Sequence, residues 1–289
     1  LNYREIDKYM FTNHPYSQSV IGSFEDLDSA SLEEFQDFYK KWYNPNNAVL
    51  VSLIKGVELG TAERMTEVIA GVAKVDTDRV AVVSGPNLAH EIAAREPAAT
   101  TVACINEEFA IKIQDACTTD YFRPYYTTDV VGVEIAGAVK NVIALANGMA
   151  VGLGYGENSQ SALMTRGLAE MSRLGVALGA NPLTFAGLAG VGDLIATCQS
   201  PLSRNRTIGV YLGEGKTIEQ AQTLTKTTSE GVKSCQSILD LANRHGVEMP
   251  ITEQVVNVIH RGTSAEKVLK AFMSRPTTAE EGQELMEHM

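Results

Sequence analysis

The sequence predicts an α/β domain followed by an all-helical domain, and three observations support this division. Between Val51 and Asp129, short apolar runs rich in β-branched residues alternate with helical segments, which is typical of a doubly wound parallel sheet. After Asp129, long apolar helical segments are separated by glycine-rich loops. The first 50 residues resemble neither region, because they hold more than half of the aromatic residues but one of the 24 glycines. We therefore expect three parts, 1–50, 51–130 and 131–289.

The first part contains one predicted helix with an aromatic face. Ser31 and Glu34 have the spacing of a capping box, which marks a helix N-terminus. Apolar residues then recur at helical spacing until Asn44 and Pro45 end the pattern. The residues on this face are Leu32, Phe35, Phe38, Tyr39 and Trp42.

The second part is expected to form a parallel sheet whose strands are joined by helices. The runs 48–54, 80–83 and 100–105 are short and apolar, so they are predicted strands, and 122–127 is a further extended segment. Helices are predicted at 61–73, shortly after Pro86, and at 107–117. In the third part, helices are predicted to start at Asp193 and Ser203 and to span 133–151, 161–178, 217–223, 231–245, 252–260 and 265–273.

The charge and composition of the chain exclude several classes of partner. A net charge of −11 repels nucleic-acid phosphates and anionic lipid headgroups, so we expect no binding to nucleic acid or membranes. No apolar run reaches the roughly 18 uninterrupted residues of a membrane span. The four cysteines are widely spaced and the five histidines are scattered, so neither a disulfide framework nor a metal site is expected. We expect a cytoplasmic protein whose sequence, lacking an initiator Met, starts within a gene or has been trimmed.

Lys55 directly follows the first predicted strand of the sheet. Open α/β sheets bind ligands outside the carboxyl ends of their strands, so a lysine at this position is suited to hold a phosphate or a carboxylate. The alternative is a lysine in a solvated loop.

Lys140 lies within a predicted apolar helix. Its neighbours one turn before and after are apolar or small, namely Ala136, Gly137, Ile143 and Ala144. Burial penalises the ammonium form and lowers the pKa, which allows a lysine to act as a general base near neutral pH. The alternative is a lysine at the edge of the helix whose ammonium group reaches water.

Asp193 and the segment 203–206 each begin a predicted helix. Asp193 has Thr197 one turn later on the same face, and it is either an N-cap or a carboxylate that orients Lys140 or bonds a substrate hydroxyl. The segment 203–206 brings a hydroxyl, an amide and two guanidinium groups close to free backbone N–H groups, which favours an anion site. The alternative is that the arginines are ordinary surface residues.

The glycine clusters at 152–156 and 187–192 are predicted to be loops rather than a dinucleotide-binding turn. Both follow helices rather than strands. Neither has the GxGxxG spacing with an acidic residue about 20 positions later.

Six sequence blocks occur in order along the chain: IKGVE at 54–58, VSGPNLA at 83–89, VEIAGAVKNV at 133–142, GDLIATC at 192–198, SRNR at 203–206 and SEGVK at 229–233. In these blocks the chain resembles the bacterial NAD(P)-dependent glycerol-3-phosphate dehydrogenases. The resemblance implies part of a Rossmann-like parallel sheet followed by a helical substrate domain. It also implies oxidation of sn-glycerol 3-phosphate to dihydroxyacetone phosphate with NAD or NADP, or the reverse reduction, which supplies glycerophospholipid synthesis.

The functional residues of that family map onto the same blocks. The lysine that matches Lys140 is the family's catalytic base, and the resemblance places Lys55 and Asp193 beside it as catalytic residues. The implied substrate contacts are Lys55, Gly85, Asn87, Lys140, Asp193, Ser203, Arg204 and Asn205. The implied cofactor contacts are Lys55, Ala89, Arg204, Thr228 and Glu230. Asn87 stands where many members carry a hydroxyl residue. The resemblance is compatible with a homodimer, although the sequence itself is silent on assembly.

The chain departs from the family upstream of residue 51, where the family has a strand, a GxGxxG turn and most of a dinucleotide-binding half. Here HPY at 14–16, IGS at 21–23 and YNPNNAVL at 43–50 resemble a stretch of insulinase-type zinc peptidases that lies downstream of their metal motif. The sequence therefore predicts a peptidase fragment, without peptidase activity, fused to a truncated dehydrogenase. We expect low turnover, with a non-catalytic fusion or interaction module as the alternative. The preference for NAD or NADP stays open, because its determinant belongs to the segment that this chain lacks.

Overall fold

The computed structural model describes residues 31, 33, 36, 37, 41, 48–225 and 229–273, the last three of them by their backbone only. The chain divides into two compact units, Leu1–Ala48 and Val49–Met289, close to the change in composition near residue 50. In the first unit, residues 33, 36, 37 and 41 are helical and exposed. The aromatic residues of the predicted helix lie outside the described residues, and so does Thr228.

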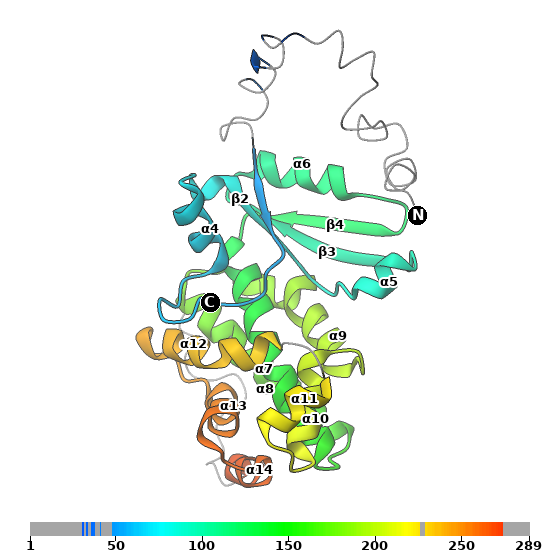
Figure 1. Ribbon diagram of the computed structural model, residues 1–289, viewed down its shortest axis with the longest axis vertical. Helices are drawn as coiled ribbons and strands as arrows, with labels where there is room; N and C mark the ends of the chain where they lie inside the picture. The colour runs from blue at the N-terminus through cyan, green and yellow to red at the C-terminus, as the bar shows by residue number, and fades with distance from the viewer. Residues whose placement is uncertain are drawn as a thin grey trace. The chain divides into compact units, whose positions relative to one another are not determined.

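A four-stranded sheet opens the second unit (Figure 1). The strands lie side by side in chain order: β1 (Leu50–Ser52), β2 (Val80–Ser84), β3 (Ala98–Ala103) and β4 (Phe122–Thr127). The pairs β1–β2 and β3–β4 are parallel, but β2 and β3 are antiparallel. The prediction of an all-parallel sheet is therefore wrong at this pair. The intervening helix α5 (Ala89–Ala93) is too short to carry the chain back along the sheet, so β3 returns directly from the end of β2.

The two parallel pairs are joined by helices α4 (Met65–Ala73) and α6 (Glu107–Cys117), and α6 has the predicted bounds. Helix α4 begins four residues later than predicted. Its first turn is fixed by Glu134, whose carboxylate accepts hydrogen bonds from the Thr66 backbone N–H at 2.8 Å and from the Thr66 hydroxyl at 2.6 Å. A carboxylate at this position satisfies N–H groups that have no partner within the helix.

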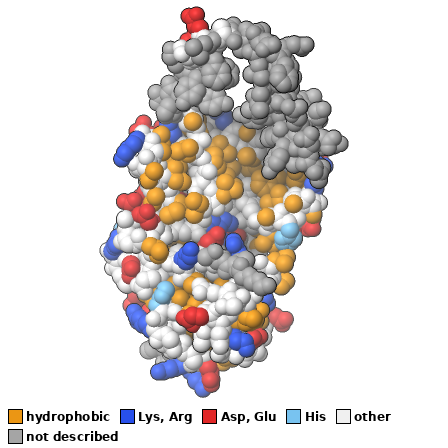
Figure 2. Space-filling model, viewed as in Figure 1, with side chains coloured by type: hydrophobic (Ala, Val, Ile, Leu, Met, Phe, Trp, Pro, Cys, Tyr) orange, Lys and Arg blue, Asp and Glu red, His pale blue; other side chains and the backbone are white. Residues whose placement is uncertain are grey.

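Neighbouring residues of β2 pack on opposite faces of the sheet, as expected for a strand. Val82 packs with residues of the helix that follows β4, including Val133, whereas Ala81 packs with Ala110 of α6. Large apolar side chains nevertheless stay exposed around the sheet, among them Leu53 and Ile54. Figure 2 shows apolar side chains over much of this half of the molecule.

The rest of the unit is helical and is built around α7 (Val130–Gly152), which is nearly completely buried. Its length and composition would allow it to span a membrane, but 94% of its apolar window is buried inside the protein, as in the core helix of a soluble protein. The helices around it are α8 (Glu157–Ala177), α9 (Asp193–Gln199), α10 (Arg204–Gly213), α11 (Ile218–Thr225), α12 (Glu230–Arg244), α13 (Pro250–Arg261) and α14 (Ala265–Met273). All of the predicted helices are present, with ends that differ by a few residues.

Glycines allow α10 to cross α7 in close contact. A Cβ atom on Gly148 of α7 would overlap the backbone of α10, and a Cβ atom on Gly209 of α10 would overlap the backbone of α7. Gly152 and Gly213 form a second such pair one turn further along. The two helix backbones therefore touch, which brings the N-terminal end of α10 next to the polar residues of α7.

Candidate active site

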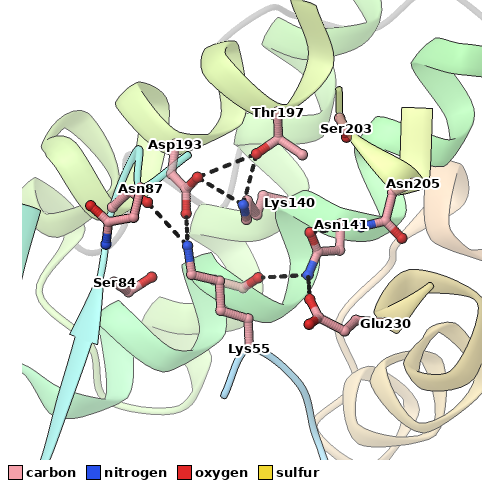
Figure 3. A network of polar contacts seen from close by, with 12 residues as sticks. Lys55, Ser84, Asn87, Lys140, Asn141, Asp193, Thr197, Ser203, Asn205 and Glu230 are labelled. Atoms are coloured by element: carbon pink, nitrogen blue, oxygen red, sulfur yellow. Dashed lines mark hydrogen bonds and ion pairs between the residues drawn. The ribbon is translucent and has the colours of Figure 1, made fainter. Parts of the chain in front are cut away.

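The three predicted catalytic residues meet in one cluster at the carboxyl edge of β2 (Figure 3). The ammonium group of Lys55 lies 2.6 Å from Oδ2 of Asp193. The ammonium group of Lys140 lies 2.7 Å from Oδ1 of the same carboxylate. A single buried carboxylate thus holds two lysines that are far apart in the sequence and come from different elements. We call Lys55, Lys140 and Asp193 the lysine cluster.

Lys140 is buried on the apolar face of α7, as the sequence predicts, with 6% of its surface exposed. Burial is the main cause that lowers its pKa from 10.5 to about 8. The Asp193 carboxylate opposes this shift, while the positive charge of Lys55 adds to it. The Lys140 ammonium also donates a hydrogen bond of 2.7 Å to the Thr197 hydroxyl. The alternative of an ammonium group that reaches water is therefore excluded.

Asp193 does not cap its own helix. It is the first residue of α9, and its two oxygens bind the lysines rather than the first N–H groups of the helix. The preceding segment, Leu188–Gly192, was predicted to be a loop but forms a π-helical turn. Such turns are rare and occur often at functional sites, because they change the direction in which the next side chains point. Of the two interpretations left open by the sequence, the structure selects the carboxylate that orients Lys140.

Lys55 is held from two sides and is not a solvated loop lysine. Its ammonium group donates a hydrogen bond of 3.0 Å to the carbonyl oxygen of Gly85, in addition to its ion pair with Asp193. Gly85 has a φ of 152°, and a Cβ atom there would lie 3.0 Å from the Thr100 hydroxyl, so a larger residue would be strained. This glycine exposes a backbone carbonyl to Lys55 at the point where the chain leaves β2.

A second group of polar residues links α7, α10 and α12. Asn205 donates a hydrogen bond of 3.0 Å to Oδ1 of Asn141, and its own Oδ1 accepts one of 3.0 Å from the backbone N–H of Gly231. The Ser229 hydroxyl also donates a hydrogen bond to Oδ1 of Asn205. Asn141 in turn donates to the Glu230 carboxylate over 3.2 Å. Asn205 therefore caps the N-terminus of α12 from another helix.

Arg204 lies at the edge of this second group. Its side chain is more than half exposed, and its guanidinium group lies 3.7 Å from the Glu230 carboxylate. Ser203 is the N-cap of α10, since its hydroxyl accepts a hydrogen bond from the Arg206 backbone N–H at 3.3 Å. The Arg206 side chain differs from that of Arg204, because its Nε is buried without a hydrogen-bond partner among the described residues.

The remaining predicted residues, Asn87 and Ala89, make no hydrogen bond with the lysine cluster. Asn87 donates a hydrogen bond of 2.9 Å to the Thr100 hydroxyl, and its Oδ1 is buried without a partner in the described part of the chain. Ala89 is exposed at the start of α5 and makes no hydrogen bond with the lysine cluster. Figure 3 shows Asn87 on the β2 side of Lys55, and Asn205 and Glu230 beyond Asn141.

Two residues of the second group, Asn141 and Ser229, were not singled out from the sequence. Asn141 follows Lys140 directly and Ser229 precedes Glu230, so both lie within blocks that carry the family resemblance. Their positions in those blocks could have indicated them. Within the described ranges, no group of three or more His, Cys, Asp or Glu side chains is arranged to hold a metal ion.

An α/β sheet, a helical half and a buried lysine–carboxylate cluster describe the architecture, and comparison with known proteins gives the class and the family. A model of the NAD-dependent glycerol-3-phosphate dehydrogenase N-terminus matches residues 29–110, and a model of the C-terminus of the same enzymes matches residues 129–270. The chain belongs to this family. The N-terminal match begins at residue 29, so it extends into the part, 1–50, that was predicted to be a peptidase fragment.

Individual relatives agree with the family models. The chain is 63% identical over 234 residues to glycerol-3-phosphate dehydrogenase [NAD(P)+] of Streptomyces griseus, covering 81% of this chain and 70% of the relative. It is 64% identical over 232 residues to the enzyme of that name from Streptomyces coelicolor, covering 80% of this chain and 69% of the relative. The crystal structure of glycerol-3-phosphate dehydrogenase from Coxiella burnetii matches with a TM-score of 0.74 and 37% identity, over 78% of this chain and 69% of that one.

The family implies a nicotinamide cofactor, and the described residues fit its reacting end. The Lys140 pKa of about 8 suits proton transfer near neutral pH, and Asn87, two residues after Gly85, has an Oδ1 that is buried without a partner among the described residues. Open α/β sheets bind ligands at the carboxyl ends of their strands, and Gly85 and Asn87 both belong to this region. A GxGxxG turn, which binds the pyrophosphate in dinucleotide-binding folds, does not occur in these 289 residues.

Proposed function

We propose that the chain interconverts sn-glycerol 3-phosphate and dihydroxyacetone phosphate, with NAD or NADP as the hydride carrier. The observation that carries this proposal is the buried Lys140, with a pKa of about 8, bound to a carboxylate and flanked by a second lysine. A lysine with this pKa has a substantial neutral fraction near physiological pH, so it can both take and return a proton. The bound nicotinamide supplies the acceptor or donor of hydride.

In the oxidation, neutral Lys140 takes the proton of the substrate C2 hydroxyl as hydride leaves C2. In the reduction, the Lys140 ammonium returns that proton to the oxygen of the carbonyl. Asp193 stabilises the ammonium form and keeps Nζ pointed toward the substrate side. Lys55, the second cation of the cluster, lies where it can stabilise negative charge that develops on the C2 oxygen, and such stabilisation is strong in a site with little water.

The substrate phosphate is proposed to bind at the N-terminal end of α10. Arg204 supplies an exposed guanidinium group, and Ser203 and Asn205 lie beside the first N–H groups of the helix. Glu230 is 3.7 Å from Arg204, a distance too long for a good hydrogen bond, so an incoming phosphate competes with a weak partner. The proposed cofactor contacts are Lys55, Ala89, Arg204, Thr228 and Glu230.

Turnover by these 289 residues is proposed to be low, because no glycine turn is available to bind the cofactor pyrophosphate. A cytoplasmic location, which was inferred from the composition, and a homodimeric assembly, which is compatible with the family resemblance, complete the proposal.

A sensitive test is the transfer of deuterium from NADH labelled at C4 of the nicotinamide to C2 of dihydroxyacetone phosphate, detected in the product by mass spectrometry. The purified chain is expected to give labelled glycerol 3-phosphate, and the variant Lys140→Met is expected to give it at least about 100-fold more slowly. The matched control is Lys112→Met, because Lys112 is exposed and its ion pair with Glu108 lies on the surface of α6. Absence of label in the unmodified chain, at cofactor and substrate concentrations that saturate relatives, would contradict the proposal.

A further inference from the structure

Ser84 is the last residue of β2 and has a buried hydroxyl group without a partner. The residue is 1% exposed, and its Oγ has no hydrogen-bond partner within the described part of the chain. Its backbone carbonyl oxygen, in contrast, accepts a hydrogen bond of 3.1 Å from the Thr100 hydroxyl. Other buried serines differ in this respect, because the hydroxyls of Ser203, Ser229 and Ser234 are all hydrogen-bonded.

The Ser84 hydroxyl lies beside the side chain of Lys55, above Gly137 of α7. A Cβ atom on Gly137 would be 3.0 Å from Ser84 Oγ, 3.3 Å from Lys55 Cγ and 3.6 Å from Lys55 Cδ. The missing side chain of Gly137 thus creates a notch that both residues fill. Figure 3 shows the Ser84 hydroxyl pointing toward the Lys55 side chain.

A buried hydroxyl without a partner destabilises the state in which it is found, so a second state that supplies the partner gains free energy. Lys55 is the group that can change state. Its ammonium group makes two hydrogen bonds, to Gly85 and to Asp193, and an ammonium group has three protons to donate. Rotation about its last two side-chain torsions moves Nζ while Cγ and Cδ stay in the notch next to Ser84.

Substrate binding is the event that would cause this rotation of the Lys55 side chain. In the proposed oxidation the substrate hydroxyl gives its proton to Lys140, and the Lys140 ammonium that forms competes with Lys55 for the one carboxylate that holds both lysines. Once Oδ2 of Asp193 is engaged elsewhere, the Lys55 ammonium needs another acceptor close to its anchored stem. The Gly85 carbonyl is one such acceptor, and the Ser84 hydroxyl is the other.

We infer that Ser84 is a positioning residue for Lys55: its hydroxyl accepts a hydrogen bond from the Lys55 ammonium when Asp193 releases it. This role deepens the proposed function, and it rests on that function only for the identity of the ligand that releases Lys55. In the unliganded protein the hydroxyl, unpaired within the described chain, does not stabilise the fold. In the liganded protein it fixes the direction in which Lys55 presents its charge.

A double-mutant cycle tests this inference without any ligand. Asp193→Asn weakens the hold on Lys55 and so imitates its release, and Ser84→Ala removes the hydroxyl. Alone, Ser84→Ala is expected to leave the melting temperature unchanged or to raise it. In the Asp193→Asn background, Ser84→Ala is expected to lower the melting temperature on the order of 5 °C. Equal effects of Ser84→Ala in the two backgrounds would overturn the inference, since independent sites are additive.

A matched control and a second measurement complete the test. Ser237→Ala also removes a buried hydroxyl, but Ser237 lies two helical turns beyond Glu230 on α12, so its effect is expected to be the same in both backgrounds. If Asp193→Asn does not fold, Asp193→Ser is used in its place. The second measurement is the affinity for sn-glycerol 3-phosphate, which Ser84→Ala is expected to weaken on the order of tenfold. Unchanged affinity in Ser84→Ala would contradict the inference. If the unmodified chain does not bind sn-glycerol 3-phosphate at all, the proposed function is contradicted, and the double-mutant cycle alone then tests the role of Ser84.

Discussion

Two buried carboxylates in this protein have similar burial but opposite surroundings. Asp193 is 2% exposed and lies between the ammonium groups of Lys55 and Lys140. Glu170 of α8 is 1% exposed, but it faces the N-terminus of α13, where it accepts hydrogen bonds of 2.5 and 3.2 Å from the N–H groups of Ile251 and Thr252. Burial raises the pKa of Glu170 to about 7, because these hydrogen bonds only partly offset the loss of water.

The comparison shows that burial alone does not create a reactive site. Glu170 replaces the local cap that α13 lacks, since its N-cap residue Met249 has no side-chain hydrogen bond to the helix. Glu134 has the same role at α4. At Asp193 the partners are two ammonium groups, and the pKa of one of them, Lys140, is lowered by burial. A buried group with a shifted pKa beside a specific charged partner is typical of functional sites.

The largest expected effect is on catalysis at the lysine cluster. Lys140→Met removes the base and is expected to lower turnover about 10²- to 10⁴-fold, the usual contribution of general acid–base catalysis. The rate of deuterium transfer from labelled NADH measures it, with Lys112→Met as the unchanged reference. A fall of less than about threefold would mean that Lys140 is not the base that carries the reaction.

The next largest effect is on the free energy of unfolding, and it distinguishes Asp193 from Glu170. Asp193→Ala leaves Lys55 and Lys140 near each other without a counter-charge, and breaking a buried ion pair in this way costs about 3–5 kcal/mol. The free energy of unfolding in urea, measured at neutral pH, gives the value. A loss below about 1 kcal/mol would show that the two ammonium groups are not held by Asp193 in solution.

The contribution of Glu170 to stability is expected to depend on pH. Its pKa is raised from 4.5 to about 7 on folding, so the folded state binds a proton more tightly than the unfolded chain does. The contribution of Glu170 to stability is therefore fully present below pH 4.5 and is lost as the pH rises through about 7. The loss relative to the variant Glu170→Gln is expected to reach about 3 kcal/mol. Glu266→Gln, an exposed substitution, is the control, and parallel pH curves for the wild type and Glu170→Gln would contradict the expectation.

The smallest expected effect concerns the exposed edge of the site. Arg204→Gln is expected to weaken the binding of sn-glycerol 3-phosphate about 10- to 100-fold, because a charged hydrogen bond to the phosphate is lost. Stability without ligand should stay unchanged, since more than half of the Arg204 side chain is exposed. Calorimetric titration gives the affinity, with Arg261→Gln as the control. Equal affinities for the two variants would place the phosphate away from α10.

Local sequence patterns predicted the features that depend on neighbouring residues. The apolar surroundings of Lys140 along one helix predicted its burial, and short apolar runs predicted three strands, while the fourth was predicted only as an extended segment. The antiparallel pairing of β2 and β3 was missed, because a strand pattern carries no information on direction. The π-helical turn before Asp193 was missed as well, since its glycines are equally typical of a loop.

Contacts between distant segments could not be predicted from local patterns. Asn205 was expected to bind substrate, and the structure shows in addition that it caps α12 and bonds Asn141. Glu134 and Glu170 cap helices whose first residues lie about 70 to 80 positions away in the chain. Helical periodicity gives no signal at such separations. A contact between Asp193 and Lys140 was one of the alternatives that the sequence left open, but the ion pair of Lys55 with the same carboxylate is known only from the structure.

The most direct test of the central claim is thermal melting of the purified chain with sn-glycerol 3-phosphate, with NADH, and with both. A ligand that binds only the folded state must raise the melting temperature. We expect sn-glycerol 3-phosphate to raise it in the unmodified chain and to raise it much less in Arg204→Gln, with a smaller contribution from NADH. An unchanged melting temperature under all three conditions would mean that the buried lysine cluster is present but does not form a working substrate site.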